Sequence, residues 1–476
     1  MINKNISLFF IGALLLCCFS SCKIPEMALR KENRYVPESF NASADTSNPA
    51  GISWRAYFGD PNLLELIDTA LQNNQELNIV LREMEIGSNE VMVRKGEYRP
   101  FVQLMGGAGF EKDGRYTRHG AVDEQLTIKE GKKIPEPLPD MMIGAFASWE
   151  IDVWKKLRNA KKAAVLRYLS SIEGKNYLTT RLIAEISSSY YELFALDNQL
   201  EIINRNIEIQ ENALHIIKQQ KEYAKATQLA VNRFEAQLLH TQNLQYAIRQ
   251  QIIETENRLN YLAGRFPQTI KRNASDSIQY GTETVHAGIP SRLLENRPDI
   301  RRAELELEAA RLDVSVARAS FYPSFRLTAG IGLQAFNAAY LVKPESILYN
   351  LAGDLIAPLV NKNAIKAAYA TANARQVQAV YEYERTILNA HVEVLNQLSR
   401  IENFSKSEET TSKEVEILTE SITISNNLFR SARADYMEVL LTQREALESR
   451  IDLVEIRLKR QLAKVNIYQA LGGGWN

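Results

Sequence analysis

Two very long stretches of this chain contain no proline and almost no glycine. The first runs from Asp140 to Phe266, and the second begins after Pro358 and runs to the C-terminus with no glycine before Gly472. Proline and glycine interrupt regular secondary structure more strongly than any other residue. Their absence over more than a hundred residues, twice, predicts very long helices.

The apolar residues in these stretches are spaced as in a coiled coil. Val415, Leu418, Ile422, Ser425 and Phe429 alternate steps of four and three residues and so share one side of a helix. A helix of 60 residues would be about 90 Å long, which few compact domains use. On this pattern alone, a periplasmic coiled-coil adaptor or scaffold is the simplest interpretation.

The N-terminus resembles a bacterial export signal. Lys4 precedes an apolar run from Ile6 to Phe19, which is shorter than the roughly 18–20 residues of a membrane helix. The run ends in Phe-Ser-Ser-Cys, which resembles a lipobox with Cys22 as the first mature residue. We expect a signal peptide over residues 1–21, a covalent lipid on Cys22 and a lipid-anchored segment over residues 22–53. A retained anchor helix is the alternative.

The rest of the sequence gives no indication of catalysis, metal binding or nucleic-acid binding. All three cysteines lie within residues 17–22, so the body has no disulfide framework and no cysteine metal site. The formal net charge is zero, which gives no basic field for nucleic acid. No nucleophile elbow, phosphate loop or zinc-protease motif is present. We expect no enzyme activity, no metal and no cofactor other than the lipid.

Four short segments break the helical pattern. Pro100–Phe110 and Ser324–Leu333 alternate between apolar and polar residues, and each has about the ten residues of a membrane-crossing β-strand. After a polar loop, each is followed by a partner segment, Met141–Val153 or Ile347–Val360. For any one segment, a small soluble sheet is the alternative.

The four segments belong to an internal repeat. A shift of 223 residues places Pro100 on Pro323, and a shift of 206 places Tyr223–Ala226 on Phe429–Ala432. The unit of helix, strand, loop, strand, long helix, turn and helix therefore occurs twice. We expect repeats over residues 54–270 and 290–476, joined by a linker over residues 271–289.

Four strands are too few to close a membrane barrel, since known barrels begin at about eight. An open edge in lipid leaves backbone groups unpaired, at several kcal/mol each. If these strands lie in a membrane, several copies must share one wall. Two copies would give eight strands and a filled interior, whereas three would give twelve strands and a lumen.

Several motifs are specific enough to suggest a family. They are Trp149–Trp154, Pro290–Arg301, Tyr322–Phe325, Ala357–Leu359 and Ala470–Trp475. With these motifs the chain resembles, from Trp54 to Trp475, the TolC-like outer-membrane factors. Within them it is similar to the lipoprotein branch that serves resistance-nodulation-division efflux pumps.

The resemblance implies a mainly α fold with a transmembrane β-barrel. It implies a homotrimer with a twelve-stranded barrel in the outer membrane and a barrel of long helices through the periplasm. It also implies a passive exit duct for small molecules, with a periplasmic adaptor and an inner-membrane pump as partners. The exit channel of a type I protein-secretion system is the alternative within the family; the lipobox and the Arg297–Arg301 stretch favour small-molecule efflux.

We expect structural roles for ten motif residues. They are Trp149, Asp152, Trp154, Arg297, Pro298, Asp299, Pro323, Pro358, Gly472 and Gly473. Pro298 with its acidic neighbour is a good helix opening. The two tryptophans suit the level of a membrane interface, although packing in a core explains them equally well.

The turns between the long helices should be the periplasmic tips, where a closed channel narrows. The tip and gate candidates are Ala226, Thr227, Asn232, Ala432, Arg433, Asp435, Tyr436 and Glu438. The family has glycine where this chain has Ala226 and Ala432. Threefold symmetry would turn each candidate into a ring, and we hypothesise that Asp435 or Glu438 forms an acidic constriction. An ordinary solvated face is the alternative.

Overall fold

The computed structural model describes residues 24–25, 27, 30–40, 52–129, 131–272, 288–431 and 433–475. The predicted signal peptide, the predicted lipidation site Cys22 and most of the predicted linker lie outside these residues. The chain divides into two compact units. The first contains Glu85–Leu169 and Leu305–Tyr381, and the second contains Glu32–Met84, Ser170–Glu304 and Glu382–Asn476.

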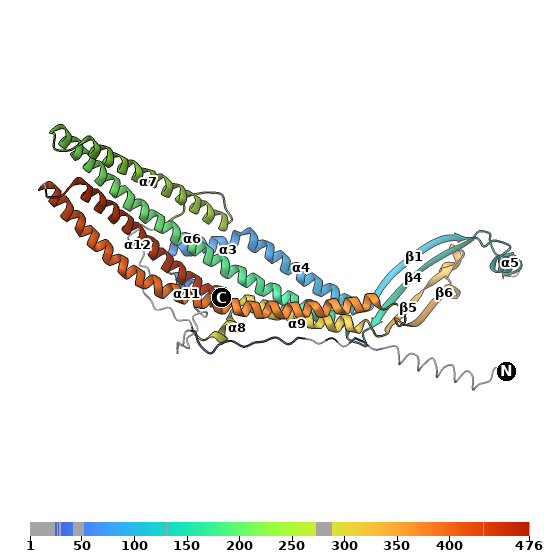
Figure 1. Cartoon of the computed structure of the whole chain (residues 1–476). Helices are drawn as coiled ribbons and strands as arrows, with labels where there is room; N and C mark the ends of the chain where they lie inside the picture. The colour runs from blue at the N-terminus through green and yellow to red at the C-terminus, as the bar shows by residue number, and fades with distance from the viewer. Residues whose placement is uncertain are drawn as a thin grey trace. The chain divides into compact units, whose positions relative to one another are not determined.

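The first unit holds a four-stranded antiparallel sheet in the order β1-β4-β5-β6 (Figure 1). Its strands are β1 (Phe101–Glu111), β4 (Leu138–Ile151), β5 (Ser324–Ala335) and β6 (Ile347–Ile356). All four predicted segments are therefore strands. The last strand ends at Ile356, before the predicted Val360, and Pro358 lies just beyond it. A proline cannot donate to the ladder, so it is suited to the end of a strand.

The connections inside the two hairpins contain short elements that the sequence pattern did not indicate. Between β1 and β4 lie α5 (Arg118–Gln125) and a small hairpin of β2 (Thr127–Lys129) and β3 (Lys132–Lys133). The Thr117 hydroxyl caps α5 by accepting from the Gly120 N–H at 3.2 Å. Between β5 and β6 lie α10 (Ala338–Leu341) and η4 (Pro344–Ser346). These elements have fewer than nine residues each, too few for a periodic pattern.

The two predicted long helical blocks are helical hairpins of matching size. The first consists of α6 (Lys156–Glu222, 67 residues) and α7 (Gln228–Leu262, 35 residues). The second consists of α11 (Asn363–Arg430, 68 residues) and α12 (Tyr436–Ala470, 35 residues). The turns fall where the repeat predicted them, and the closely matching lengths agree with a duplication.

Shorter helices complete each repeat. The helices α4 (Gln75–Glu97) and α9 (Pro298–Ala319) precede β1 and β5. The remaining helices are α2 (Trp54–Phe58), α3 (Pro61–Asn73), η3 (Pro290–Arg292) and α8 (Leu293–Asn296). Among the residues that the structure describes, no helix is both long enough and apolar enough to cross a membrane.

The core of the second unit is built around α6. Ile183, Ile186 and Tyr190 are each at most 1 % exposed, as the coiled-coil spacing predicts for a buried seam. Side chains of α2, α3 and α12 pack on them, among them Phe58 and Tyr468. Seam positions in α11 follow the same pattern, with Ser425 buried and Ile422 partly buried.

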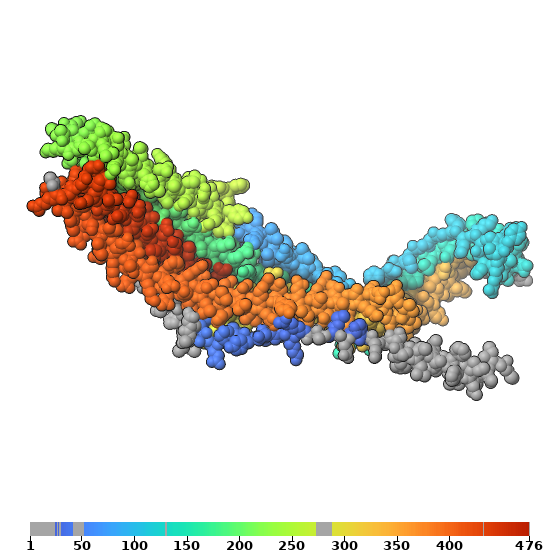
Figure 2. Space-filling model, in the orientation of Figure 1, coloured from blue at the N-terminus to red at the C-terminus, as the bar shows by residue number. Residues whose placement is uncertain are grey.

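Residues 32–40 form an extended segment that lies along α11 in the second unit. The Asn33 N–H donates to the Glu384 carboxylate at 2.9 Å. Phe40 is fully buried, and its ring stacks on His391 with 5.2 Å between centroids. Figure 2 shows this segment in blue against α11 in orange. These contacts fix residues 32–40 to one helix.

Candidate functional site

Paired residues in the sheet point to the same side, so the strand register defines two faces. One face, here the apolar face, carries no polar or charged side chain other than the indole and phenol groups of Trp149 and Tyr349. It includes Val102, Leu104 and Phe110 of β1, Ile143 and Trp149 of β4, Leu327, Ile331 and Leu333 of β5, and Ile347, Tyr349, Leu351 and Leu355 of β6. Leu104 and Leu351 are each 79 % exposed. A continuous apolar surface of this kind needs a non-aqueous neighbour or a partner.

The opposite side, here the polar face, carries the charged and amide side chains of the sheet. They are Gln103, Glu111, Asp140, Glu150, Arg326, Gln334, Asn350 and Asp354, with Ser148 and Thr328 between them. The Gln334 amide donates to both oxygens of Asp140 at 2.9 and 3.0 Å. Strands that are apolar on one side and polar on the other are typical of membrane sheets that surround water.

The two outer strands of the sheet are unguarded. β1 and β6 each have a neighbour on one side only, and every residue of β1 is exposed. Soluble proteins protect edge strands with charges, proline or short length. β1 is 11 residues long and carries no charge before Glu111, and β6 is 10 residues long with a single charge, Asp354, on the polar face. Both edges are therefore suited to pairing with another chain.

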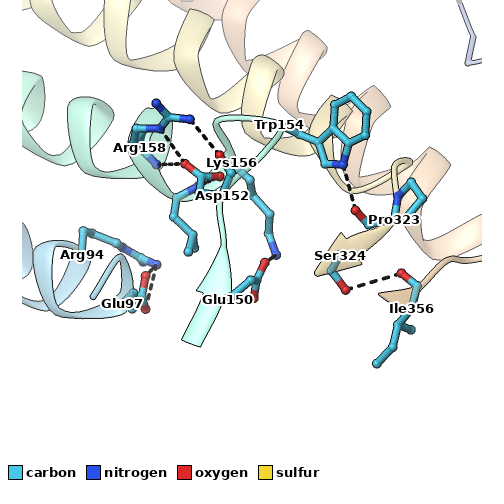
Figure 3. Close-up of polar contacts among 11 residues, drawn as sticks. Arg94, Glu97, Glu150, Asp152, Trp154, Lys156, Arg158, Pro323, Ser324 and Ile356 are labelled. Atoms are coloured by element: carbon cyan, nitrogen blue, oxygen red, sulfur yellow. Dashed lines mark hydrogen bonds and ion pairs between the residues drawn. The ribbon is translucent and has the colours of Figure 1, made fainter. Parts of the chain in front are cut away.

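Asp152 organises the turn from β4 into α6 (Figure 3). Its carboxylate accepts from the backbone N–H groups of Leu157 and Arg158 at 3.0 and 2.9 Å. It also accepts from the Arg158 Nε at 3.1 Å. The carboxylate thus satisfies two free N–H groups of the first helical turn, where negative charge is favourable. Pro358 occupies the equivalent place of the second repeat and cannot do this.

The indole N–H groups of Trp149 and Trp154 each donate a hydrogen bond to a backbone carbonyl that is distant in sequence. The Trp154 Nε1 donates to the Pro323 carbonyl at 2.8 Å (Figure 3), and its ring stacks on Tyr322 at 4.5 Å. The Trp149 Nε1 donates to the Tyr98 carbonyl at 3.2 Å. The motifs around Trp154 and Pro323, far apart in sequence, therefore meet at one end of the sheet.

Two helix-to-helix junctions share the same hydrogen bond, in which the residue before one helix donates to the last carbonyl of another. Asn74 directly precedes α4, and its Nδ2 donates to the carbonyl of Leu262, the last residue of α7, at 2.9 Å. Arg297 directly precedes α9, and its Nη1 donates to the carbonyl of Ala470, the last residue of α12, at 2.9 Å. The repeat shift of 223 residues places Asn74 on Arg297, so the two donors are equivalent. We did not select Asn74 from the sequence, although this shift could have identified it.

The second junction uses a buried charge where the first uses an amide. Arg297 is only 5 % exposed. Its Nε and Nη2 donate to the two Asp299 oxygens at 2.9 and 2.7 Å, and its Nη1 donates to Glu393 at 2.7 Å. Burial by itself would lower the pKa of the Arg297 guanidinium. The hydrogen bonds and charges of the two carboxylates outweigh it and raise that pKa.

The C-terminal glycines allow the chain to close over this junction. Gly472 has a φ of 88°, and a Cβ there would lie 2.6 Å from the Asn296 carbonyl oxygen. A Cβ on Gly473 would lie 2.4 Å from the Tyr468 ring. Burial raises the pKa of Tyr468 to about 12. Both glycines are therefore required by close packing, and Pro298 begins α9 as predicted.

The first helical tip differs from the expected geometry. The left-handed residue of this turn is Ala224, with a φ of 55°, and not Ala226, where the family has glycine. Ala226 packs instead on an apolar tip cluster that includes Leu214 and Phe234. Thr227 caps α7 by accepting from the Ala230 N–H at 3.2 Å, and Asn232 accepts from the Gln228 amide at 2.6 Å.

The second tip contributes to the same cluster. Tyr436 packs on it, whereas Arg433, Asp435 and Glu438 are exposed. Asp435 directly precedes α12 and makes no side-chain capping bond. Ala432 lies outside the described residues. The tip candidates of the two repeats are thus close together, and their role in gating stays a prediction.

Among the described residues, no group of three His, Cys, Asp or Glu side chains is placed to hold a metal ion.

Comparison with known proteins identifies the family of this chain. The family model described as "Outer membrane efflux protein" matches residues 66–265 and 289–473. The two matched segments correspond to the two repeats.

Curated relatives match over nearly the whole chain. The pyoverdine export outer membrane protein OpmQ of Pseudomonas aeruginosa is 28 % identical over 487 residues, covering 100 % of this chain and 98 % of that protein. The probable outer membrane lipoprotein SilC of Salmonella typhimurium is 26 % identical over 446 residues, covering 92 % and 93 %.

Solved structures share the fold. A crystal structure of CusC has a TM-score of 0.81 at 23 % identity and covers 95 % of this chain and 100 % of its own. The open state of the MtrE outer membrane channel of Neisseria gonorrhoeae has a TM-score of 0.81 at 22 % identity, covering 96 % and 99 %. These likenesses confirm the predicted TolC-like fold.

Proposed function

Because the chain belongs to the outer membrane efflux protein family, we propose that three copies form the exit duct of a tripartite efflux pump. As a family member the protein is an outer-membrane efflux channel and not an enzyme. The proposal adds the homotrimer, the periplasmic adaptor and the inner-membrane pump of the resistance-nodulation-division class. It also adds the lipid on Cys22 and the passive conduction of small molecules.

The main support for this proposal is that the sheet has one apolar face, one polar face and two unprotected edge strands. In the assembly, β6 of one copy pairs with β1 of the next, so that no edge is left open in lipid. The apolar face contacts lipid and the polar face lines the lumen. Twelve strands leave a lumen wide enough for water and solutes.

The helical region supports the same assembly. On α7, Leu239, Tyr246 and Ile253 are spaced seven residues apart and are 59 %, 65 % and 52 % exposed. A heptad stripe of this kind is a packing seam without a partner in its own chain. Neighbouring copies would cover it and thereby close a wall of helices.

Small molecules or ions are the proposed cargo. The names of the relatives refer to pyoverdine export, cation efflux, and solvent or toluene efflux. None of these names refers to protein secretion, which supports small-molecule efflux over the secretion alternative. Which cargo passes is determined by the pump that binds the inner end.

A matched pair of variants tests the assignment of the two faces. Leu351→Arg puts a charge on the apolar face of β6, and Asn350→Arg puts the same charge one residue away on the polar face. Arginine on a lipid-facing strand position costs about 2–4 kcal/mol at the bilayer centre. Leu351→Arg should lose detergent-resistant trimers, whereas Asn350→Arg should assemble and conduct with altered ion preference. A water-soluble monomeric wild type, without pores in planar bilayers, would refute the proposal.

The acidic constriction at the tips is tested separately. Asp435→Asn with Glu438→Gln removes both carboxylates and leaves their size unchanged. If these side chains form the narrowest ring, the double variant should lose cation preference in single-channel recordings. Unchanged conductance and selectivity would place the constriction elsewhere. Lys413→Gln with Glu409→Gln, an exposed pair within α11, is the control.

A further inference from the structure

Phe146 is an aromatic residue on the polar face, among glycines. It belongs to β4 and lies opposite Gly330 of β5. A Cβ on Gly330 would lie 2.8 and 2.9 Å from the ring atoms Cδ1 and Cε1 of Phe146. A Cβ on Gly144, two residues along β4, would lie 3.2 Å from Cε2. The Phe146 ring therefore lies against the sheet, over the space that side chains at both positions would fill.

The glycine at position 330 is there for space and not for backbone shape. Gly330 is absent from the positive-φ glycines of the described chain, so any residue could adopt its backbone conformation. Glycine inside a strand is otherwise unfavourable, because it loses more conformational entropy on folding than other residues and has no side chain to pack against its neighbours. For Gly144 and Gly332 a Cβ would come within 2.8 and 2.6 Å of backbone oxygens of the neighbouring strand. At Gly330 the nearest atoms are instead side-chain atoms, namely Asn350 Oδ1 at 2.3 Å and then the two ring atoms of Phe146.

We propose that Gly330 is a positioning residue that keeps the Phe146 ring flat and so sets the width of the lumen at this level. The inference rests on the proposed function, in which the polar face lines the lumen. With a Cβ at position 330, both the Asn350 side chain and the Phe146 ring must shift. We expect the amide to rotate aside and the ring to turn to a rotamer that stands away from the sheet. Threefold symmetry would bring three such rings into the lumen at the same height.

The test uses conductance and solute exclusion in planar bilayers. Gly330→Ala should assemble, yet lose part of the single-channel conductance and exclude polyethylene glycols that the wild type admits. Gly330→Ala with Phe146→Ala should regain both properties, because the displaced ring is gone. Gly330→Ala with Asn350→Ala should not regain them. Phe146→Ala alone should change little, since the seated ring narrows the lumen little.

Gly353→Ala is the matched control. It adds the same methyl group to the neighbouring strand, on the apolar face, where the nearest atom is Leu327 Cδ2 at 3.4 Å. It should leave conductance and solute exclusion at wild-type values. Detergent-resistant trimers and far-ultraviolet circular dichroism establish that each variant is folded.

Three outcomes would overturn the inference. They are a conducting Gly330→Ala variant with wild-type exclusion, a Phe146→Ala rescue that fails, and a large gain in conductance from Phe146→Ala alone. The last of these also decides the case if Gly330→Ala does not assemble. A wild type without pores would instead refute the proposed function, so the two failures are distinguishable.

Discussion

Replacing Arg297 with leucine should strongly destabilise the second helix junction. Arg297 is 5 % exposed, and its guanidinium donates to Asp299, Glu393 and the Ala470 carbonyl. Leucine keeps most of the packing volume but removes every donor. Breaking a buried ion pair from one side costs about 3–5 kcal/mol, because the remaining charge is left without a partner.

The exposure of the two carboxylates refines this magnitude. The Glu393 side chain is 52 % exposed and can turn to water, whereas the Asp299 side chain is 21 % exposed. Most of the loss should therefore come from Asp299 and from the Ala470 carbonyl. We expect a cost near the lower end, about 3 kcal/mol. Asn74→Ala removes neutral hydrogen bonds at the first junction and should cost about 1–2 kcal/mol.

The assay is thermal unfolding of the detergent-solubilised protein, followed by far-ultraviolet circular dichroism. All variants are heated at one scan rate, because irreversible unfolding makes the midpoint depend on that rate. Arg297→Leu with Asp299→Asn should recover about 1 kcal/mol relative to additivity, since it removes the stranded charge. Equal losses from Arg297→Leu and Asn74→Ala, or strict additivity in the double variant, would refute the assignment of a buried charged junction.

Three further changes have defined expectations. Ala224→Gly should stabilise the first tip by about 0.5–1 kcal/mol, because Ala224 has a positive φ. Ala226→Gly should destabilise the same tip, because it removes a methyl group from the tip cluster. Thermal unfolding checks this pair, since the two variants should shift the midpoint in opposite directions. Asp152→Ala should cost about 1–2 kcal/mol by uncapping α6, and chemical denaturation against the isosteric Asp152→Asn variant measures how much of that is charge. Burial lowers the pKa of His391 below its ordinary value, so the folded state favours the neutral ring. The contribution of the neutral His391 ring to folding stability is complete above the unfolded-state pKa of about 6.5. That contribution is lost as the pH falls through the lowered pKa of the folded state. The protection factors of the amides of residues 32–40, which are corrected for the slower intrinsic exchange at low pH, should therefore fall on acidification in the wild type. A His391→Gln variant with the same pH response would contradict the expectation.

The long helices and the strands could be predicted from the sequence, because proline-free length, seven-residue spacing and alternation are local signals. The positions of both tips followed from the repeat shift. The junction of Arg297 could not be predicted, because it depends on contacts with Glu393 and Ala470, which are distant in sequence. For the same reason, glycine at position 330 gave no local sign of Phe146, its partner on another strand.

The first tip shows where a motif alone was insufficient. The family pattern directs attention to position 226, where this chain has alanine instead of glycine. The backbone that requires glycine-like freedom is at Ala224, two residues earlier. The alanine at 226 is tolerated because its φ is ordinary and its methyl group packs on the tip cluster. A substitution in a motif therefore has to be judged by the local φ and packing.

The sheet, although a small part of the chain, decides between a channel and a coiled-coil scaffold. Long helices with buried seams suit both, and so do the two helix junctions. A scaffold in water would need polar residues on both exposed faces of the sheet, or a covering layer over the apolar face, and protection of each edge strand. Here one face exposes Leu104 and Leu351 at 79 %, and the edge strand β1 has no charge until its last residue. Water cannot solvate that surface at an acceptable cost, whereas lipid on one face, a lumen on the other and a second copy at each edge satisfy every part of it.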